Sequence, residues 1–205
     1  MRILITAGGT REYIDPVRFI SNASSGRMGY ALVRAALRAG HKVTLITSPT
    51  GQRPPKGAKV VEAETAARMF EEVRNNFEMC DCLIMAAAVS DYTPARTAKT
   101  KIKKSNKALT LRLKPTTDIL KWAGKHKRKK QIVVGFALED KNLRQNAEIK
   151  LKEKNLDMII ANTTDVIGAE KSTVQIKTPN CRWLKLHQAS KTRIAQKIIS
   201  LVRTI

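Results

Sequence analysis

In the first half of the chain, short apolar runs alternate with longer segments whose apolar residues recur every three to four positions. Short apolar runs predict β-strands, and a period near 3.6 predicts amphipathic α-helices. The predicted order is strand, helix, strand, strand, helix and strand, over residues 2–7, 25–39, 42–47, 60–63, 65–77 and 80–89. Elements in this order form a parallel sheet with right-handed crossovers. We therefore expect an α/β, Rossmann-like three-layer fold with a mainly parallel sheet.

The second half of the chain is less regular. Residues 91–107 are polar and basic and contain Pro94, which favours a lid loop. The further predicted elements are strands at 109–113, 131–138 and 157–161, helices at 118–123, 142–154 and 190–202, and a β-hairpin at about 173–186. Because no internal repeat or linker interrupts the pattern, we expect residues 1–205 to form a single domain with a small hairpin and lid region.

The composition excludes several classes of protein. Of the 205 residues, 42% are hydrophobic, which suits a globular chain with a sizeable core. No apolar run reaches the roughly 18 residues that cross a bilayer, and Met1 leads into the first strand rather than into a signal peptide. Cys80 and Cys82 lack the second pair that a zinc site requires. We therefore expect buried, reduced thiols and a cytoplasmic protein.

The net charge of the chain is its most unusual property. The sequence has 39 Lys and Arg against 17 Asp and Glu, a formal charge of +22, and most of the excess follows residue 100. This balance favours an anionic partner, and three kinds are open: nucleic acid, a membrane surface or a phosphorylated small molecule. Only 4% of the residues are aromatic, and the basic runs contain almost none. Nucleic acid is therefore the less favoured partner, and the basic run at 125–130 predicts a solvated turn.

Candidate chemistry follows the predicted strands, because ligands of open parallel sheets bind at the carboxyl ends of the strands. The segment between the first strand and its helix lacks the G-x-G-x-x-G pattern of dinucleotide-binding turns. It still places Ser24, Ser25 and Gly26 at a helix start, where free N–H groups bind phosphate. The two serines could equally act only as helix caps.

Three further segments combine small, charged and aromatic residues at such positions. The alanines at 86–88 would let a ligand lie against the backbone, although small residues packed under a helix explain them more simply. Asp91 adds a carboxylate for a ribose hydroxyl or a metal-bound water. The lysines at 99–104 form either a solvated surface or a lid over a triphosphate. Phe136 either covers a base or belongs to the core.

Taken together, these segments resemble the phosphopantothenoylcysteine synthetase family of coenzyme A biosynthesis. The resemblance covers residues 3–161 and rests on the motifs ITAGGTRE at 5–12, DPVRFISN at 15–22, SSGRMG at 24–29, AAVSDY at 87–92, KIKK at 101–104, GFALE at 135–139 and KNLD at 154–157. It implies a ligase that joins 4'-phosphopantothenate to L-cysteine. CTP would be consumed through an acyl-cytidylate, with release of pyrophosphate and CMP. In many bacteria this domain follows a flavin-containing decarboxylase, so the start at Met1 suggests the stand-alone form or an excised domain.

The resemblance also implies roles for individual residues. Lys101 would neutralise charge at the α-phosphate and Asn22 would handle the acyl-cytidylate, with Arg18 as a third catalytic group. Contacts to the substrate and its phosphate are implied for Ser24, Ser25, Gly26, Asn22 and Ala88. Nucleotide contacts are implied for Met85, Ala86, Ala87, Asp91, Lys101, Thr117, Asp118, Ile119, Leu120, Phe136, Lys150 and Lys154.

The resemblance further implies Mg²⁺ with the nucleotide, no membrane, and a homodimer to which the hairpin at 173–186 contributes. The metal ligands stay unassigned. The KIKK run and Phe136 favour CTP, and ATP is the alternative. Thr116 and Thr117 depart from the family, which usually has Asn-Pro before Asp118. Two other classes of protein stay open. One is a basic nucleic-acid-binding module, and the other is a nicotinamide-dependent reductase, which the missing G-x-G-x-x-G pattern disfavours.

Overall fold

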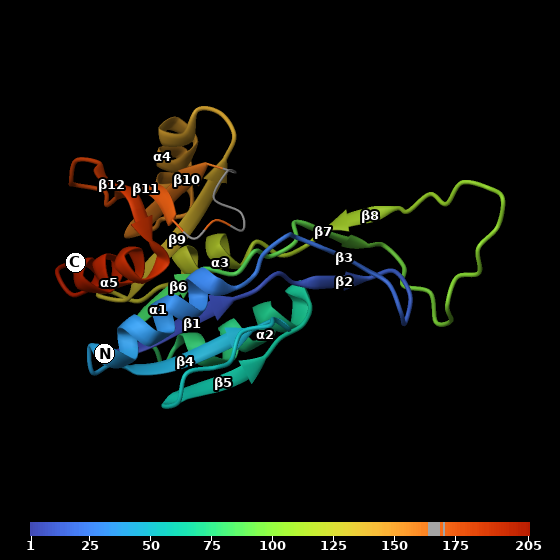
Figure 1. Cartoon of the computed structure of the whole chain (residues 1–205), viewed down its shortest axis with the longest axis horizontal. Helices are drawn as coiled ribbons and strands as arrows, with labels where there is room; N and C mark the ends of the chain where they lie inside the picture. The colour runs from blue at the N-terminus through green and yellow to red at the C-terminus, as the bar shows by residue number, and fades with distance from the viewer. Residues whose placement is uncertain (164–168, 170) are drawn as a thin grey trace.

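An eight-stranded sheet runs through the protein in the order β12-β11-β10-β9-β6-β1-β4-β5 (Figure 1). The structure is a computed structural model that describes residues 1–163, 169 and 171–205. The strands of this sheet are β1 (Arg2–Ala7), β4 (Lys42–Thr47), β5 (Ala58–Glu62), β6 (Cys82–Met85), β9 (Ile132–Glu139), β10 (Met158–Thr163), β11 (Lys171–Lys177) and β12 (Leu184–Ser190). Neighbouring strands from β10 to β5 are parallel, and only the pairs made by β11 are antiparallel. The prediction of a mainly parallel α/β sheet is confirmed.

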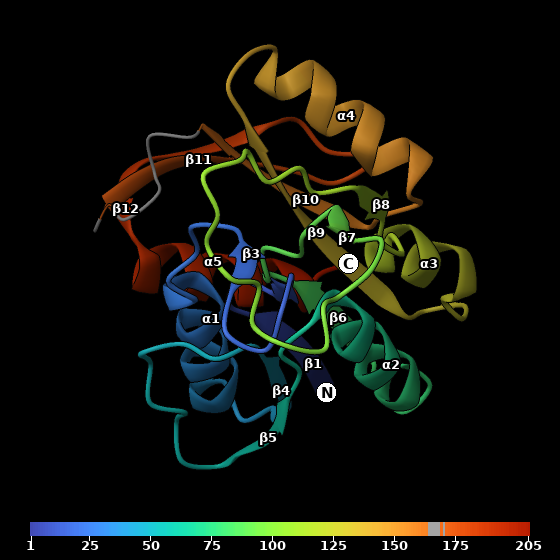
Figure 2. The same cartoon turned by 90° about the vertical axis from the view of Figure 1, so that its right-hand side faces the viewer.

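Helices cover both faces of the sheet and complete the three layers (Figure 2). They are α1 (Arg27–Arg38), α2 (Ala66–Phe77), α3 (Ile119–His126), α4 (Leu143–Glu153) and α5 (Lys191–Val202). Side chains alternate across β1: Ile3 and Ile5 enter the core under α1 and α5, and Leu4 enters the core under α2, α3 and α4. In the described part of the chain, no helix is long and apolar enough to cross a membrane.

Local signals set the helix starts. The Thr65 hydroxyl accepts a hydrogen bond from the Arg68 N–H at 3.2 Å, and Asp118 and Ser190 cap α3 and α5 in the same way. Helix α1 is different, because it begins after Gly26, whose φ of 71° lies in the left-handed region, and it has no side-chain cap. The predicted start at residue 25 is therefore two residues early.

Two strand predictions are corrected by the structure. The apolar run at 80–89 gives only β6, because the chain leaves the sheet after Met85 and touches it again through a single bridge between Gly9 and Ala88. The predicted strand at 109–113 is wrong except for its last residue, which begins β8 (Leu113–Pro115). Leu109 and Leu111 alternate as in a strand, but both are exposed, and no strand in the described part of the chain pairs with them.

Two small hairpins lie beyond the carboxyl ends of the main strands. β7 (Tyr92–Pro94) pairs with β8, and the residues 92–115, called the arm below, project from the body of the protein (Figure 1). The predicted lid loop lies in this arm. β2 (Arg11–Tyr13) pairs with β3 (Phe19–Ser21), and the sequence analysis missed both strands. Strands of 3 residues are too short to show a period of two.

The predicted hairpin at 173–186 is present as β11 and β12. It does not project from the domain, because β11 also pairs with β10 and so continues the main sheet to its edge. Val174 and Ile176 alternate with half-buried residues and enter the core under α1 and α5. The segment that projects is therefore the arm and not this hairpin.

Candidate functional site

The site begins where β1 and β6 end, and glycine allows the chains to approach closely there. Gly8 and Gly9 follow β1, and the Ala88 N–H donates to the Gly8 carbonyl at 2.8 Å. A Cβ atom at Gly9 would lie 2.7 Å from the main-chain oxygen of Asn22. A larger residue at Gly9 would push away the segment that carries Asn22.

Asn22 and Ala88, which the sequence analysis placed on the substrate side, are brought together. The Asn22 side-chain amide donates to the carbonyls of Ala88 at 3.3 Å and Val89 at 3.2 Å. Asn22 is nevertheless exposed. An amide in this position is fixed by the main chain and stays accessible to a ligand.

The start of α1 lies next to Asn22 and has the properties of an anion site. The Ser24 N–H donates to the Asn22 carbonyl at 2.7 Å, and the Ser24 hydroxyl accepts only from the Gly26 N–H, at 3.4 Å. Neither serine caps the first turn of α1, so the interpretation of the serines as helix caps is not supported. The first turn of α1 has no side-chain cap and contains no acidic residue, which leaves its N–H groups free for an anion, as at helix ends that bind phosphate.

A cavity of about 170 Å³ lies beside these segments, between the end of β6, the start of α3 and α4. Its lining contains every residue assigned above to the nucleotide except Ala86 and Lys101. The lining residues are Met85, Ala87, Val89, Asp91, Thr116, Thr117, Asp118, Ile119, Leu120, Phe136, Lys150 and Lys154. Val89 and Thr116 were missed. Thr116 departs from the family pattern, and its hydroxyl donates to the Ser90 carbonyl at 2.6 Å, which fixes the cavity wall.

Two lysines one turn apart on α4 give this cavity a positive side. The Lys150 ammonium donates to the Phe136 carbonyl at 2.8 Å, and Lys154 pairs with Asp118 at 2.7 Å. Burial, with the nearby charge of Lys154, lowers the pKa of Lys150. Burial alone would raise the pKa of Asp118, but its bonds to Lys154 and to the Lys121 N–H hold that pKa below its ordinary value. Asp118 therefore stays ionised at neutral pH and keeps its ion pair with Lys154.

The metal ligands left open by the sequence are still unassigned. No group of three His, Cys, Asp or Glu side chains in the described residues could hold a metal ion. Mg²⁺ that accompanies a nucleotide needs only one or two carboxylates, since phosphate and water supply the other oxygens. Asp91 lines the cavity and is exposed, whereas Asp118 is already committed to Lys154. Asp91 therefore fits such a role best.

Arg18 and Lys101 lie on the arm side of the site, and neither lines the cavity. The Arg18 guanidinium is bound to Asp15 and donates to the Ile102 carbonyl at 2.8 Å. Lys101, next to Ile102, is exposed. Sequence analysis placed Arg18 in catalysis, and the structure shows that most of its hydrogen-bonding groups are used inside the protein. Asp15 was missed as a site residue, although it stands three residues before Arg18.

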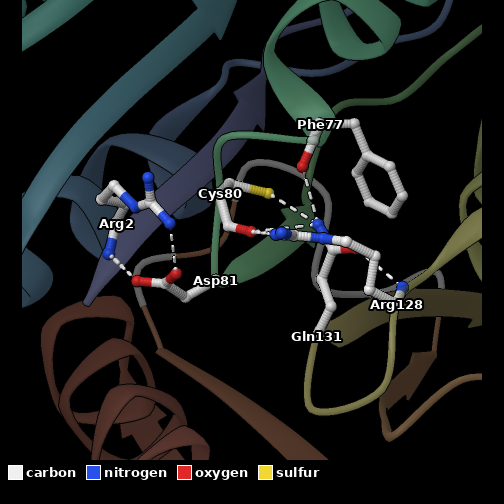
Figure 3. A network of polar contacts seen from close by, with 6 residues as sticks. All are labelled: Arg2, Phe77, Cys80, Asp81, Arg128 and Gln131. Atoms are coloured by element: carbon white, nitrogen blue, oxygen red, sulfur yellow. Dashed lines mark hydrogen bonds and ion pairs between the residues drawn. The ribbon is translucent and has the colours of Figure 1, made fainter.

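The opposite, amino-terminal edge of the sheet explains part of the positive charge. There Gln131 is buried, and its amide donates to the carbonyls of Phe77 at 2.7 Å and Cys80 at 3.0 Å (Figure 3). Arg128 donates to the same Cys80 carbonyl at 3.1 Å, and Lys127 pairs with Asp157 at 2.7 Å. The run at 125–130 is therefore only partly the solvated turn that was expected.

A cavity of about 540 Å³ lies at this amino-terminal edge, lined by residues 127–132 and by the end of the chain. It is larger than the cavity beside Asn22. However, ligands of open parallel sheets bind at the carboxyl ends of the strands. Of the motif residues quoted above, the lining described for this cavity contains Asp157 alone, and Asp157 is paired with Lys127. We therefore take the smaller cavity as the candidate site.

A parallel α/β sheet with a lysine-lined cavity at the carboxyl ends of its strands defines a class of ligand-binding α/β domains. The family model described as DNA/pantothenate metabolism flavoprotein C-terminal domain matches residues 1–205. The chain belongs to this family.

Three similar proteins illustrate the relationship. A prokaryotic protein named cysteine/cysteine sulfinic acid decarboxylase is 43% identical over 100% of this chain and 58% of its own length. The coenzyme A biosynthesis bifunctional protein CoaBC of Borreliella burgdorferi is 40% identical over 98% of this chain and 52% of its own length. The chain thus spans about half the length of these relatives. A crystal structure of the C-terminal domain of a CoaBC protein superposes with a TM-score of 0.86, at 37% identity, over 99% of this chain and 94% of that one.

Proposed function

We propose that this chain is a ligase that joins 4'-phosphopantothenate to L-cysteine, using CTP through an acyl-cytidylate with release of pyrophosphate and CMP. Membership of the family and similarity to CoaBC proteins along the whole chain support the reaction. The observation that carries the proposal is the arrangement of the candidate residues. Residues assigned separately to nucleotide and to substrate lie around one cavity and at the strand ends beside it.

The reaction consists of two displacements. A carboxylate oxygen of phosphopantothenate bonds to the α-phosphorus of CTP, and the bond from that phosphorus to pyrophosphate breaks. The cysteine amine then bonds to the acyl carbon, the bond to CMP breaks, and the amine proton passes to solvent. Lys150 and Lys154 would bind the phosphates of CTP. The N–H groups at the start of α1 would bind the phosphate of the substrate. Lys101 would neutralise the charge at the α-phosphorus. The Asn22 amide would donate to the acyl group.

Mg²⁺ is proposed as the ion that accompanies the nucleotide. When bound, it would neutralise phosphate charge. Asp91 would contribute its carboxylate, and its exposed position at the cavity leaves room for water and phosphate oxygens. CTP is preferred to ATP because the KIKK run at 101–104 and Phe136 resemble the CTP-using type of the family.

We further propose a homodimer in the cytoplasm. The arm exposes Leu109, Leu111 and Leu113 at 57%, 39% and 42%, a row of apolar side chains that a second copy of this chain would cover. The hairpin of β11 and β12 contributes only if its edge strand β12 also pairs across the interface. The buried free thiols of Cys80 and Cys82 suit a reducing compartment.

Coupled pyrophosphate release, measured with CTP and ATP side by side, tests this function. We expect release that depends on phosphopantothenate, is faster with CTP, and turns over with CMP formation only when cysteine is present. Release that is equal with both nucleotides would leave the ligase but remove the preference for CTP. No release with either nucleotide would overturn the proposed function.

A further inference from the structure

The base of the arm is joined to the β2–β3 hairpin by a short row of hydrogen bonds. The Thr97 hydroxyl donates to the Tyr13 carbonyl at 3.0 Å, and the Ala98 N–H donates to the Ile14 carbonyl at 2.9 Å. Ile102 is the last residue of this row. In the part of the chain that the structure describes, residues 103–111 form hydrogen bonds only among themselves. Lys101 therefore stands at the boundary between the attached and the unattached parts of the arm.

The attachment of Ile102 depends on one buried carboxylate. Asp15 has an exposed fraction of 0%. Its Oδ1 accepts from the N–H groups of Val17 at 2.9 Å and Arg18 at 2.8 Å. Its Oδ2 accepts from the Ile102 N–H at 3.1 Å and from the Arg18 side chain, with Nε at 2.9 Å.

Arg18 completes the attachment from the other side. Its Nη2 binds Asp15 and also donates to the Ile102 carbonyl at 2.8 Å. The carboxylate thus holds the N–H of Ile102 while the guanidinium holds its C=O. Asp15, Arg18 and Ile102 are called the latch below. Hydrogen bonds with ionised partners are stronger than neutral ones, so the latch is the firmest part of the row.

We propose that Asp15 is a positioning residue that, through Arg18 and Ile102, fixes the main chain next to Lys101 before any ligand binds. The inference rests on the proposed function, in which Lys101 acts at the α-phosphorus. Consecutive Cα atoms are about 3.8 Å apart, so a fixed Ile102 keeps the Cα atom of Lys101 within that distance of the latch. Ordering the main chain at Ile102 in advance means that the chemical step does not bear the entropy cost of ordering it.

The Asp15 carboxylate of the latch stays ionised at neutral pH. The Arg18 guanidinium holds the pKa of Asp15 well below its ordinary range. Burial opposes this effect, and the N–H groups of Val17 and Ile102 add to it. The role therefore needs no change of protonation.

Trypsin provides a test that does not depend on enzymatic activity, because the arm contains lysines on both sides of the latch. Lys99 and Lys101 lie within the attached row, whereas Lys104 and Lys107 lie beyond it. Proteolysis requires local opening of the chain. We expect initial cleavage rates, followed by mass spectrometry, to be about tenfold or more lower at the inner pair than at the outer pair.

The variant Asp15→Asn removes the charge with almost no change in shape. With its oxygen toward Val17, the new amide would present an NH₂ group to the Ile102 N–H and to the guanidinium, which are donors too. Cleavage at Lys99 and Lys101 should rise about tenfold or more and cleavage at Lys104 should not change.

Two further variants keep the test decisive. Arg18→Lys retains a cation for the buried carboxylate, so it protects the fold, but it cannot bind Asp15 and the Ile102 carbonyl together. It should raise the inner cleavage rates by a smaller factor. Asp81→Asn is the matched control. Asp81 lies at the opposite edge of the sheet, where it accepts from the main-chain N–H of Arg2 at 2.7 Å and from the Arg2 guanidinium at 2.9 Å (Figure 3). This control should leave cleavage of the arm unchanged.

Activity measurements separate this inference from the proposed function. If Asp15 acts through Lys101, Asp15→Asn lowers kcat, and combining it with Lys101→Gln costs nothing beyond Lys101→Gln alone. Losses that multiply would overturn the positioning role, as would unchanged inner cleavage in both folded latch variants. An unsubstituted chain without ligase activity removes the proposed function, while its cleavage pattern still decides whether the latch exists.

Discussion

The two edges of the central sheet differ in the polar groups that they leave available to a ligand. At the amino-terminal edge, Gln131 and Arg128 donate to main-chain carbonyls, and Asp81 pairs with Arg2 (Figure 3). At the carboxyl edge, the first turn of α1 has no side-chain cap, and the side chains of Asp91 and Lys101 are exposed. Groups that are satisfied within the protein contribute stability, and accessible groups left without a partner are available to a ligand.

Two aspartate–arginine pairs, one at each edge of the sheet, show the difference between the edges most clearly. Asp81 and Asp15 each accept from the N–H and the guanidinium of one arginine. The Asp81 side chain is 36% exposed and joins two strand ends, whereas the Asp15 side chain is buried and also holds a third residue, Ile102, of a projecting segment. An ion pair therefore affects function through the element to which it is attached.

The largest effect on activity is expected for Lys101→Gln. Loss of the ammonium group at the α-phosphorus should lower kcat for pyrophosphate release about 100-fold or more. Lys107→Gln, on the unattached part of the arm, is the control and should have little effect. Unchanged kcat in Lys101→Gln would show that the free lysine at the carboxyl edge is only surface charge.

A smaller effect is expected at the cavity. Lys150→Met should weaken CTP binding about tenfold or more, measured by calorimetry, because a buried charge that faces the phosphates is removed. Lys152→Met, an exposed position on the same helix, should bind CTP normally. Equal affinities of the two variants would contradict the assignment of the cavity to the nucleotide.

The pH dependence of CTP binding should show a change of a few fold. Because burial lowers the pKa of Lys150, its ammonium loses its proton below the pH of about 10.4 at which a free lysine titrates. Affinity for the triphosphate should therefore decline as the pH rises toward that value. Lys150→Arg keeps its charge, so its affinity should stay level over the same range; a decline as steep as in the unsubstituted chain would exclude Lys150 as the cause.

The smallest effect on activity is expected at the amino-terminal edge. Gln131→Ala leaves the carbonyls of Phe77 and Cys80 without their amide donor and should lower the free energy of unfolding by about 2–3 kcal/mol. Urea unfolding measures this change, with the exposed Gln145→Ala as control. The kcat/KM of the folded variant should stay within about twofold of the unsubstituted value. A larger loss would mean that this edge also serves catalysis.

Most of the central sheet was predictable because its central strands are buried on both faces and its helices are amphipathic. The apolar runs of β1, β4 and β9 and the cap at Thr65 are local signals that tertiary structure does not override. The end of β6 was not predictable, because Ala86–Ala88 continue the apolar run after the chain has left the sheet. Leu109 and Leu111 led to the prediction of a strand that is absent from the described structure, because an alternating pattern alone does not supply a strand to pair with.

The candidate site was predictable only in part. The resemblance of the sequence to a known family named nearly all the residues that line the cavity, but position in the chain could not show that Asp118 and Lys154 pair with each other. Nor could it reveal Asp15, because the carboxylate derives its role from Ile102, which is 87 positions away. Long-range contacts of this kind depend on tertiary structure and leave no local pattern.

The central claim is that the chain activates a carboxylate on CTP before cysteine enters. It is tested most directly by mixing the protein with CTP, Mg²⁺ and phosphopantothenate without cysteine, quenching, and analysing the products by mass spectrometry. We predict one equivalent or less of phosphopantothenoyl-cytidylate per site together with pyrophosphate, and its conversion to phosphopantothenoylcysteine and CMP when cysteine is added. Product formation with cysteine but with release of CDP and phosphate would contradict the claim.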